Sequence, residues 1–262
     1  MTTAAMHIAR TGLDAQNTRM RVISNNLANV NTTGFKRDRA SFETLSYQTV
    51  TAAGAPSTAE TRYAIGMNLG TGVRVQGTAR IDTQGSFQQT ENALDLAMDG
   101  DGFFQVDMPD GSIGYTRAGN FSRSPEGLLV TSEGYQVQPG ITIPEGATAI
   151  TIGMDGSVSA TVPGQTAPAE LGQIQVASFV NSAGLTSVGD NYLRESAASG
   201  APIVGVAGVD GRGSIRQGML EGSNVNVVEE LVDMIETQRA YEVNSKMISA
   251  TDEMLRYVNQ NL

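Results

Sequence analysis

The 262-residue sequence contains no cysteine and no tryptophan, and these absences exclude several kinds of site at once. Without cysteine the chain has no disulfide, no thiolate metal ligand and no cysteine nucleophile. His7 is the only histidine. We interpret it as an ordinary helix residue, because no nucleophile is spaced to pair with it. We therefore expect no catalytic residues and no metal-binding residues.

Motifs for cofactor binding are also missing. The glycines at residues 70–72 and 211–213 are not followed by the further glycine that a dinucleotide-binding loop requires. Asp99 and Asp101 suggest a calcium loop, but Phe103 stands where the third oxygen ligand is needed. We expect no cofactor. One enzymatic alternative stays open, since a pair of carboxylates on a β-scaffold can carry out acid–base chemistry.

The chain has little positive charge. It carries 17 basic and 27 acidic side chains, a formal net charge of −10, with an isoelectric point of about 4.6. Such a chain is a poor ligand for nucleic acid, so no nucleic-acid partner is expected. The one basic cluster, residues 36–39, is interpreted as a solvated connector, with an intersubunit contact as the alternative.

Long hydrophobic runs are absent as well. No segment approaches the roughly 20 consecutive apolar residues of a membrane span. The first ten residues lack a basic segment followed by an apolar run, so we expect no Sec signal peptide. That expectation fits a cytosolic protein and equally one exported by another route.

Residues 2–30 show a helical period. Apolar residues recur every seven positions, and a second series, with one polar member, lies three places further on: Met6, Leu13, Met20 and Leu27, then Ala9, Gln16, Ile23 and Val30. This spacing predicts a helix with one apolar face. Residues 31–34, Asn-Thr-Thr-Gly, are typical of a helix exit.

The C-terminal segment repeats this pattern more strongly and predicts a helix over residues 227–262. Asn226 and Glu229 form a capping-box pattern at its start. Leu231 and Ile235 widen an apolar stripe with sevenfold spacing that consists of Val227, Met234, Tyr241, Ile248, Leu255 and Leu262. Periodicity does not distinguish an intramolecular helix pair from helices that pack between subunits of a polymer.

The middle of the chain has short apolar runs separated by turn signals and shows no helical period, so we predict antiparallel β-structure. Residues 44–72 stand apart, because they are rich in small residues and threonine; they predict a flexible segment or a projecting hairpin. The predicted fold class is α+β, with long N- and C-terminal helices paired as a coiled coil and an antiparallel β-rich middle domain.

Two segments at opposite ends of the chain resemble the terminal signatures of the bacterial flagellar rod and hook axial proteins. They are residues 12–15 with 22–37, and residues 223–226 with 229–235 and 238–244. The middle, at residues 100–106, 115–117, 128–131 and 137–139, is similar to the distal rod proteins of that family. The likeness covers nearly the whole chain.

The resemblance implies a structural subunit of the flagellar distal rod and not an enzyme. Such subunits polymerise helically into a rigid hollow shaft that transmits torque from motor to hook. The implied partners are other copies of the chain, the proximal rod protein, the hook protein, the P-ring and L-ring proteins and the flagellar type III export apparatus. The implied location is the basal body, in the rod that crosses the periplasm toward the outer membrane.

The resemblance also implies three regions. Residues 1–35 and 222–262 would form an inner terminal-helix domain, residues 36–72 a connector with a rod-specific extension, and residues 73–221 a β-rich outer domain. Extension contacts are expected at Tyr47, Thr49, Val50, Pro56, Tyr63 and Met67. Axial packing between subunits is expected at Leu13, Met20, Ile23, Asn25, Asn26, Leu27, Asn29, Val227, Leu231, Met234, Ile235, Gln238, Arg239, Tyr241, Ile248 and Leu255.

Two alternatives remain. Another axial subunit of the same family, from the proximal rod or the hook, would share both terminal signatures. A β-rich carbohydrate-binding or hydrolytic domain with helical ends would instead be a monomer.

Overall fold

The computed structural model describes residues 2–56, 62–163 and 167–260, and the chain divides into two compact units. The helical unit comprises Met1–Leu27, Asp38–Ala79 and Asn226–Leu262, and the β-rich unit comprises Ala28–Arg37 and Arg80–Val225. These units are defined by contacts within one chain. The predicted inner domain, connector and outer domain concern positions in a polymer, so they stay a prediction.

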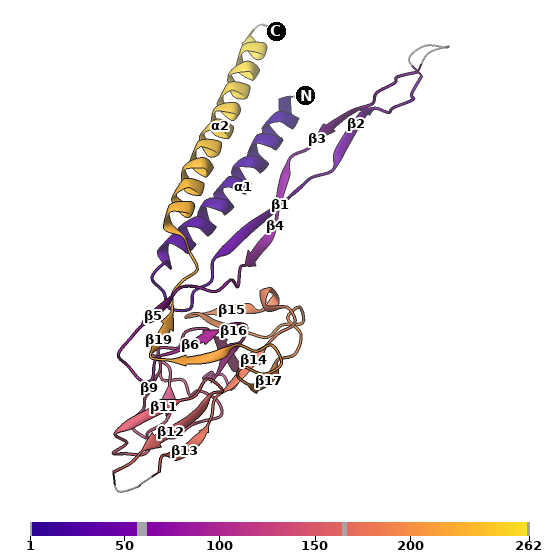
Figure 1. Ribbon diagram of the computed structural model, residues 1–262. Helices are drawn as coiled ribbons and strands as arrows, with labels where there is room; N and C mark the ends of the chain where they lie inside the picture. The colour runs from indigo at the N-terminus through magenta and orange to yellow at the C-terminus, as the bar shows by residue number, and fades with distance from the viewer. Residues whose placement is uncertain (1, 57–61, 164–166, 261–262) are drawn as a thin grey trace. The chain divides into compact units, whose positions relative to one another are not determined.

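The helical unit contains two helices and a long β ribbon (Figure 1). Its elements are α1 (Thr2–Ala28), α2 (Val227–Gln260), β1 (Asp38–Thr44), β2 (Tyr47–Thr51), β3 (Met67–Gly70) and β4 (Val73–Arg80). β1 pairs with β4, and β2 pairs with β3. α1 lies between the antiparallel α2 and the ribbon (Figure 1). The backbone N–H of Val73 donates to Thr11 Oγ1 at 3.3 Å and so joins the ribbon to α1.

α2 begins where the sequence predicts. Asn226 Oδ1 accepts from the backbone N–H of Val228 at 3.1 Å and of Glu229 at 3.5 Å, which satisfies donors that have no partner within the helix. Glu229 and Glu230 stand in the first turn, where negative charge is favourable next to the positive end of the helix dipole. α1 ends at Ala28, a few residues before Gly34.

The predicted fold class is wrong, because the apolar sevenfold residues of α2 do not form a coiled-coil seam with α1. A coiled-coil seam would bury the sevenfold residues, yet Val227 and Tyr241 are 39% and 42% exposed. The β-structure is also not confined to one middle domain, since β1–β4 belong to the helical unit. The structure consists instead of a two-helix unit with a β ribbon and a separate β-rich unit.

The β-rich unit is built around a six-stranded sheet with the order β15-β16-β8-β7-β14-β17, whose neighbours run antiparallel. Smaller sheets pair β10 with β9, β18 with β6 and β19 with β5, and join β11, β12 and β13. The bounds are β5 (Phe87–Gln89), β6 (Leu96–Asp99), β7 (Phe103–Asp107), β8 (Ile113–Thr116), β9 (Ser122–Arg123), β10 (Leu129–Val130), β11 (Ala149–Ile152), β12 (Ser157–Thr161), β13 (Ala169–Gln173), β14 (Gln175–Ser178), the 3₁₀ turn η1 (Ser182–Gly184), β15 (Thr186–Gly189), β16 (Tyr192–Arg194), β17 (Ile203–Val206), β18 (Ser214–Gln217) and β19 (Met219–Glu221).

Hydrophobic side chains pack on both faces of the six-stranded sheet. Successive strand residues point to opposite faces, so Phe103 and Phe104 enter different clusters. Phe104 packs edge-to-face on Phe121 in the larger cluster, with ring centroids 5.2 Å apart. Phe103 and Tyr115 belong to the smaller cluster, where both contact Phe179. These two cores hold the loops of the β-rich unit in place.

Within the described part of the chain, neither helix has a stretch long and apolar enough to span a bilayer.

Candidate assembly surfaces and a buried charge cluster

The first turns of α2 present an exposed apolar surface. We call this surface the α2 patch; its side chains are 39–69% exposed, and it consists of Val227, Val228, Leu231, Val232 and Ile235. At 100° per residue these positions share one side of the helix. Exposed apolar patches on an otherwise polar chain mark sites that another molecule covers.

α2 meets α1 through polar side chains on a different face. Arg19 Nη2 lies 3.0 Å from Asp233 Oδ1, and Asn26 Nδ2 donates to Glu230 Oε1 at 3.2 Å. A Cβ on Gly12 would lie 3.1 Å from Asn244 Nδ2, so glycine allows a close approach there. On α2 this polar contact follows its own sevenfold line, which consists of Glu230, Thr237, Asn244 and Thr251.

Asn26 joins α1 to both other parts of the helical unit. Its Nδ2 donates to the backbone oxygen of Asp38 at 2.9 Å, and its Oδ1 accepts from the Asp38 N–H at 2.9 Å. The side-chain amide thus pairs with the start of β1 as a neighbouring strand would. Because Asn26 is 1% exposed, each of these groups would otherwise be buried without a partner.

The other predicted axial residues lie in different environments. On α1, Ile23 is buried, Leu13, Met20 and Leu27 are half-buried, and Asn25 is exposed; Asn29, just after α1, is half-buried. On α2, Met234, Ile248 and Leu255 are half-buried, while Val227, Leu231, Ile235, Gln238, Arg239 and Tyr241 are exposed. Leu262 lies outside the described residues. Whether these residues pack between subunits stays a prediction.

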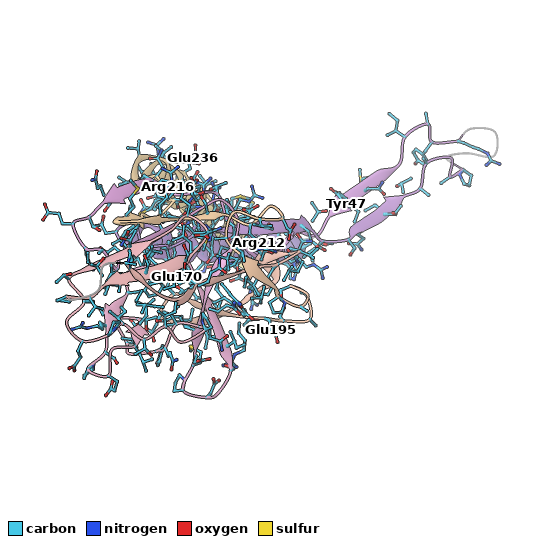
Figure 2. All side chains as sticks on the ribbon, turned by 60° about the horizontal axis from the view of Figure 1, so that its bottom comes forward. Tyr47, Glu170, Glu195, Arg212, Arg216 and Glu236 are labelled. Carbon is cyan, nitrogen blue, oxygen red and sulfur yellow. The ribbon has the colours of Figure 1, made fainter. Side chains whose placement is uncertain are left out.

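The predicted extension carries exposed apolar side chains on the β2–β3 pair and on the segment that connects the two strands. Tyr47 stands on this ribbon (Figure 2). The exposed fractions run from 47% to 84% for Tyr47, Val50, Tyr63, Ile65, Met67 and Leu69. Thr49 and Pro56 are exposed too, and residues 57–61 of the predicted extension lie outside the described residues. An isolated two-stranded ribbon is only marginally stable in water. Its exposed apolar side chains can therefore gain stability by packing against another surface.

The β-rich unit contains a buried charge cluster that sequence reasoning missed. Lys36 Nζ donates to Glu221 Oε1 at 2.6 Å and to the backbone oxygen of Thr83 at 2.8 Å. Glu221 Oε1 also accepts from the Gly85 N–H at 2.9 Å, and Arg117 Nη1 lies 3.4 Å from Glu221 Oε2. The Lys36 and Glu221 side chains are 3% and 0% exposed. The interpretation of Lys36 as a solvated connector residue is therefore wrong.

Burial governs the electrostatics of this cluster. It lowers the pKa of Lys36 below its ordinary value, although the Glu221 carboxylate acts in the opposite direction. Burial likewise lowers the pKa of Arg117, again against Glu221. The only signal in the sequence was the scarcity of lysine, since Lys36 and Lys246 are the only two in the chain.

Asn224 reinforces the same region. Its Oδ1 accepts from the Arg37 N–H at 2.7 Å, and its Nδ2 donates to the backbone oxygen of Ile81 at 2.8 Å. Arg37, Ile81 and Asn224 each lie within a few residues of a point where the chain passes to the helical unit. The cluster and Asn224 therefore fasten together three chain segments that lead to the helices and the ribbon.

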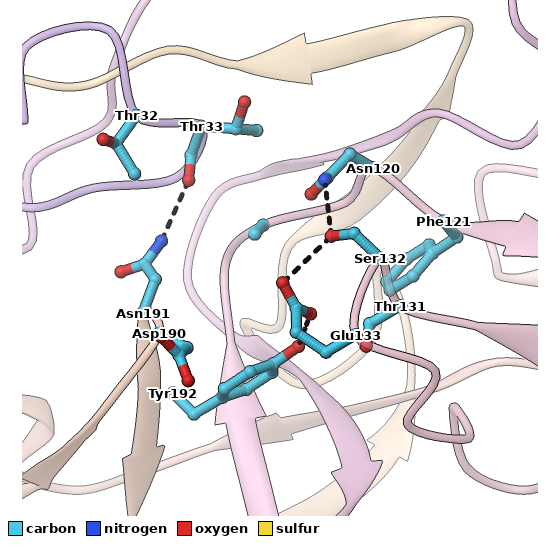
Figure 3. A pocket seen from close by; sticks show the side chains of 11 residues that line it. Thr32, Thr33, Asn120, Phe121, Thr131, Ser132, Glu133, Asp190, Asn191 and Tyr192 are labelled. Atoms are coloured by element: carbon cyan, nitrogen blue, oxygen red, sulfur yellow. Dashed lines mark hydrogen bonds between the residues drawn. The ribbon is translucent and has the colours of Figure 1, made fainter.

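A polar cavity of about 160 Å³ in the β-rich unit bears on the enzymatic alternative. Tyr192 Oη donates to Glu133 Oε2 at 2.5 Å, Ser132 Oγ donates to Oε1 at 3.1 Å, and Asn120 donates to Ser132 (Figure 3). Burial alone would raise the pKa of Glu133, but these hydrogen bonds outweigh it and lower the pKa. Burial raises the pKa of Tyr192. The carboxylate stays ionised and the phenol neutral, so the pair is not poised for proton transfer.

No metal centre accompanies this cavity. Among the described residues, no three His, Asp or Glu side chains are grouped so that they could hold a metal ion. His7 lies on α1 with its Nδ1 3.3 Å from the backbone oxygen of Thr71.

Comparison with known proteins then decides the family. Residues 6–36 match the model "Flagella basal body rod protein", residues 97–160 the "Flagellar hook protein FlgE/F/G D1 domain", and residues 216–261 the "Flagellar basal body rod FlgEFG protein C-terminal". The flagellar basal-body rod protein FlgG of Buchnera aphidicola subsp. Acyrthosiphon pisum is 52% identical over 256 residues, which is 98% of each chain.

The chain belongs to the FlgG family of flagellar basal-body rod proteins.

Two proteins of one organism show that this chain is more similar to FlgG than to FlgF, a second axial protein. The FlgG of Caulobacter vibrioides is 46% identical over 257 residues, 98% of each chain. The FlgF of the same organism is 36% identical over 258 residues, 96% of each chain. The sequence therefore resembles FlgG more than FlgF at nearly equal coverage.

Membership in the FlgG family confirms the resemblance drawn from the terminal segments and the middle of the chain. FlgG proteins are structural components of the flagellar basal body, so the predictions of a non-enzymatic chain and of this location are confirmed by the relatives. As a rod family, FlgG proteins assemble with copies of themselves and with other axial flagellar proteins.

Proposed function

We propose that this chain is the structural subunit of the flagellar distal rod. Copies polymerise helically into a rigid, hollow drive shaft that transmits torque from the motor to the hook. The likeness to FlgG over nearly the whole chain supports this function, and the greater identity to FlgG than to FlgF supports it over another axial role.

The α2 patch is the observation that carries the proposal. Its five side chains are exposed although the opposite face of α2 already contacts α1. Covering them would contribute about 1 kcal/mol each, because roughly half of each side chain is still in contact with water. A neighbouring copy that covers the patch thereby gains several kcal/mol per subunit, repeated along a polymer.

The remaining predicted axial residues are assigned to the same packing. Leu13, Met20 and Leu27 on α1 and Met234, Ile248 and Leu255 on α2 are half-buried, so a neighbour can cover what is left exposed. We assign residues 1–35 and 222–262 to the inner wall of the shaft and residues 73–221 to its outer part. The exposed apolar side chains of β2 and β3 would lock adjacent copies and stiffen the shaft.

We further propose the partners that a distal rod requires. The proximal rod protein would lie on one side of the polymer and the hook protein on the other, with the P-ring and L-ring proteins around it. The flagellar type III export apparatus would deliver the chain unfolded. The rod would then cross the periplasm toward the outer membrane.

Substitution of Leu231 by aspartate tests this function. Leu231→Asp places a charge within the α2 patch, so the variant should remain folded as a monomer but fail to restore motility and complete rods in a strain that lacks the gene. The matched control is Ser245→Asp, which adds the same charge at an exposed position of α2 outside the patch. Normal swimming by the Leu231→Asp variant would contradict the proposal.

A further inference from the structure

A second cavity in the β-rich unit, of about 200 Å³, is lined by charged, aromatic and small side chains. It lies where β7 begins and β14 ends, beside the residues that lead into η1. The lining residues that matter here are Asp82, Asp101, Phe103, Arg117, Phe179 and Val180. A volume of this size accommodates one side chain or a small ligand.

Arg117 is a buried donor with an unmet hydrogen bond at this cavity. Its side chain is 5% exposed, and its Nε finds no acceptor among the described residues. Its Nη1 is engaged with Glu221, and its guanidinium carbon lies 5.2 Å from the ring centroid of Phe103. A buried donor without an acceptor is destabilising, so a group that accepts from Nε would be bound favourably.

The surrounding charges determine which acceptor fits. Glu221, Asp82 and Asp101 act on Arg117 as three carboxylates. They are matched by Arg117 itself, by Lys36 on Glu221, and by Arg80, whose Nε lies 2.7 Å from Asp82 Oδ1. An anion or a cation added here would leave one charge uncompensated in a largely buried place. The site therefore favours a neutral acceptor, such as a peptide carbonyl, an amide or a hydroxyl.

An exposed apolar side chain lies at the rim of the cavity. Val180 is 85% exposed and follows the half-buried Phe179, so an apolar surface borders the buried donor. A neutral apolar contact with a polar centre is typical of the core of a protein–protein interface, where charged residues are depleted. A neutral contact also suits two copies that each carry a net charge of −10, because it places no additional acidic side chains close together.

We propose that this cavity is a docking site for a second copy of the chain. The second copy inserts a neutral acceptor against Arg117 and places an apolar side chain over Val180. The inference rests on the proposed axial assembly and adds to it a contact that involves the β-rich unit and not the terminal helices.

The test uses the absence of cysteine from the chain. Val180→Cys and Ile235→Cys are each reacted with a maleimide, first in the folded monomer and then in isolated basal bodies. The proposal expects both cysteines to react in the monomer and both to lose labelling in the rod. Protection of Ile235→Cys with full labelling of Val180→Cys overturns the docking site and leaves the rod function standing. Labelling of both in intact rods contradicts the proposed function as well.

A charge at the rim supplies an independent measurement. Val180→Asp should lower the yield of complete rods, whereas Val188→Asp should not, since Val188 is an exposed β15 residue that does not line the cavity. Both positions are exposed, so both variants should fold, and circular dichroism checks this. Equal rod yields from the two variants would mean that solvent satisfies Arg117 in the assembled rod, and would overturn the proposal.

Discussion

Gly34 has a φ angle of +67°, and a Cβ at this position would lie 2.6 Å from the backbone carbon of Arg117. Two separate requirements therefore select glycine. The left-handed conformation costs other residues roughly 1–2 kcal/mol. The contact is with backbone, which cannot rotate away as a side chain can. The Gly34 N–H also donates to the Glu221 backbone oxygen at 2.8 Å, next to the buried charge cluster.

Gly34→Ala should consequently lose more stability than a glycine substitution that is limited by φ alone. Gly111 is the matched control, because its φ is +78° and nothing lies within 4 Å of the position that a Cβ would take there. We expect Gly111→Ala to lower the free energy of unfolding by about 1 kcal/mol and Gly34→Ala to lower it clearly further. Chemical denaturation of both variants measures this. Equal losses would show that the Arg117 backbone moves freely.

Lys36 is held by a carboxylate and a backbone oxygen in the interior of the β-rich unit. Lys36→Met should lower the free energy of unfolding by about 3 kcal/mol, because it leaves Glu221 buried with one partner fewer. Arg216→Met is the control. It breaks an ion pair with Asp99 that is 45% and 36% exposed and should cost less than about 1 kcal/mol. Similar losses would mean that the buried ion pair contributes no more to the free energy of unfolding than the exposed one does.

Glu133 gives stability a defined pH dependence. Its pKa is lowered from the ordinary value of 4.5, so its contribution is present above pH 4.5 and is lost as the pH falls through the lowered folded-state value. Tyr192→Phe removes one of the hydrogen bonds that lower this pKa. The difference in free energy of unfolding between wild type and Tyr192→Phe should therefore narrow from pH 6 to pH 3. A difference that does not change with pH would mean that Tyr192→Phe loses stability through packing and not through the hydrogen bond to Glu133.

At the scale of elements, the start of α2 could be predicted from the sequence, whereas its contact with α1 could not. Asn226 predicted the start of the helix, because capping depends on neighbours two and three residues away. The pairing of the helices did not follow from the apolar period. The line from Val227 to Leu255 lies beside the residues that face α1, so Val227 and Tyr241 are exposed while Met234, Ile248 and Leu255 are half-buried.

The buried residues of α2 are polar and gave no apolar signal. Glu230, Thr237 and Thr251 are buried on α2, and Asn26 is buried on α1. In a sequence such residues read as solvent-facing. Glu230 meets its partner Asn26 only across 204 residues, and Thr237 and Thr251 donate to backbone oxygens four residues earlier in α2. The charge cluster was missed for the same reason: Lys36 and Glu221 are 185 residues apart. Local motifs could be predicted, whereas the pairing of distant polar residues could not.

The β ribbon is the element with the clearest mechanical prediction. Deletion of residues 46–66 removes β2 with its connection and leaves only part of the exposed apolar surface. Rods made of this variant should be curved or uncontrolled in length, because adjacent copies lose a contact that resists bending. Electron microscopy of isolated basal bodies gives the measurement. Straight rods of normal length would contradict the role of the ribbon.

At the scale of the whole molecule, two features of the chain fit a subunit that functions in a polymer. The β-rich unit has two hydrophobic cores of its own, while the helical unit leaves the α2 patch and the ribbon exposed. The buried charge cluster and Asn224 fasten the segments through which the chain passes from one unit to the other. Axial assembly requires a stable β-rich unit together with helices whose exposed apolar side chains can pack against a neighbouring copy.

The central claim is that a neighbouring copy covers the α2 patch, and the accessibility of Ile235 tests it most directly. A single cysteine at Ile235, in a chain that has no other, should react rapidly with a maleimide in the folded monomer, where Ile235 is 50% exposed. In isolated basal bodies the account predicts that this cysteine is protected and reacts only after the rods are dissociated. Equal labelling of the intact rod and the monomer would contradict it.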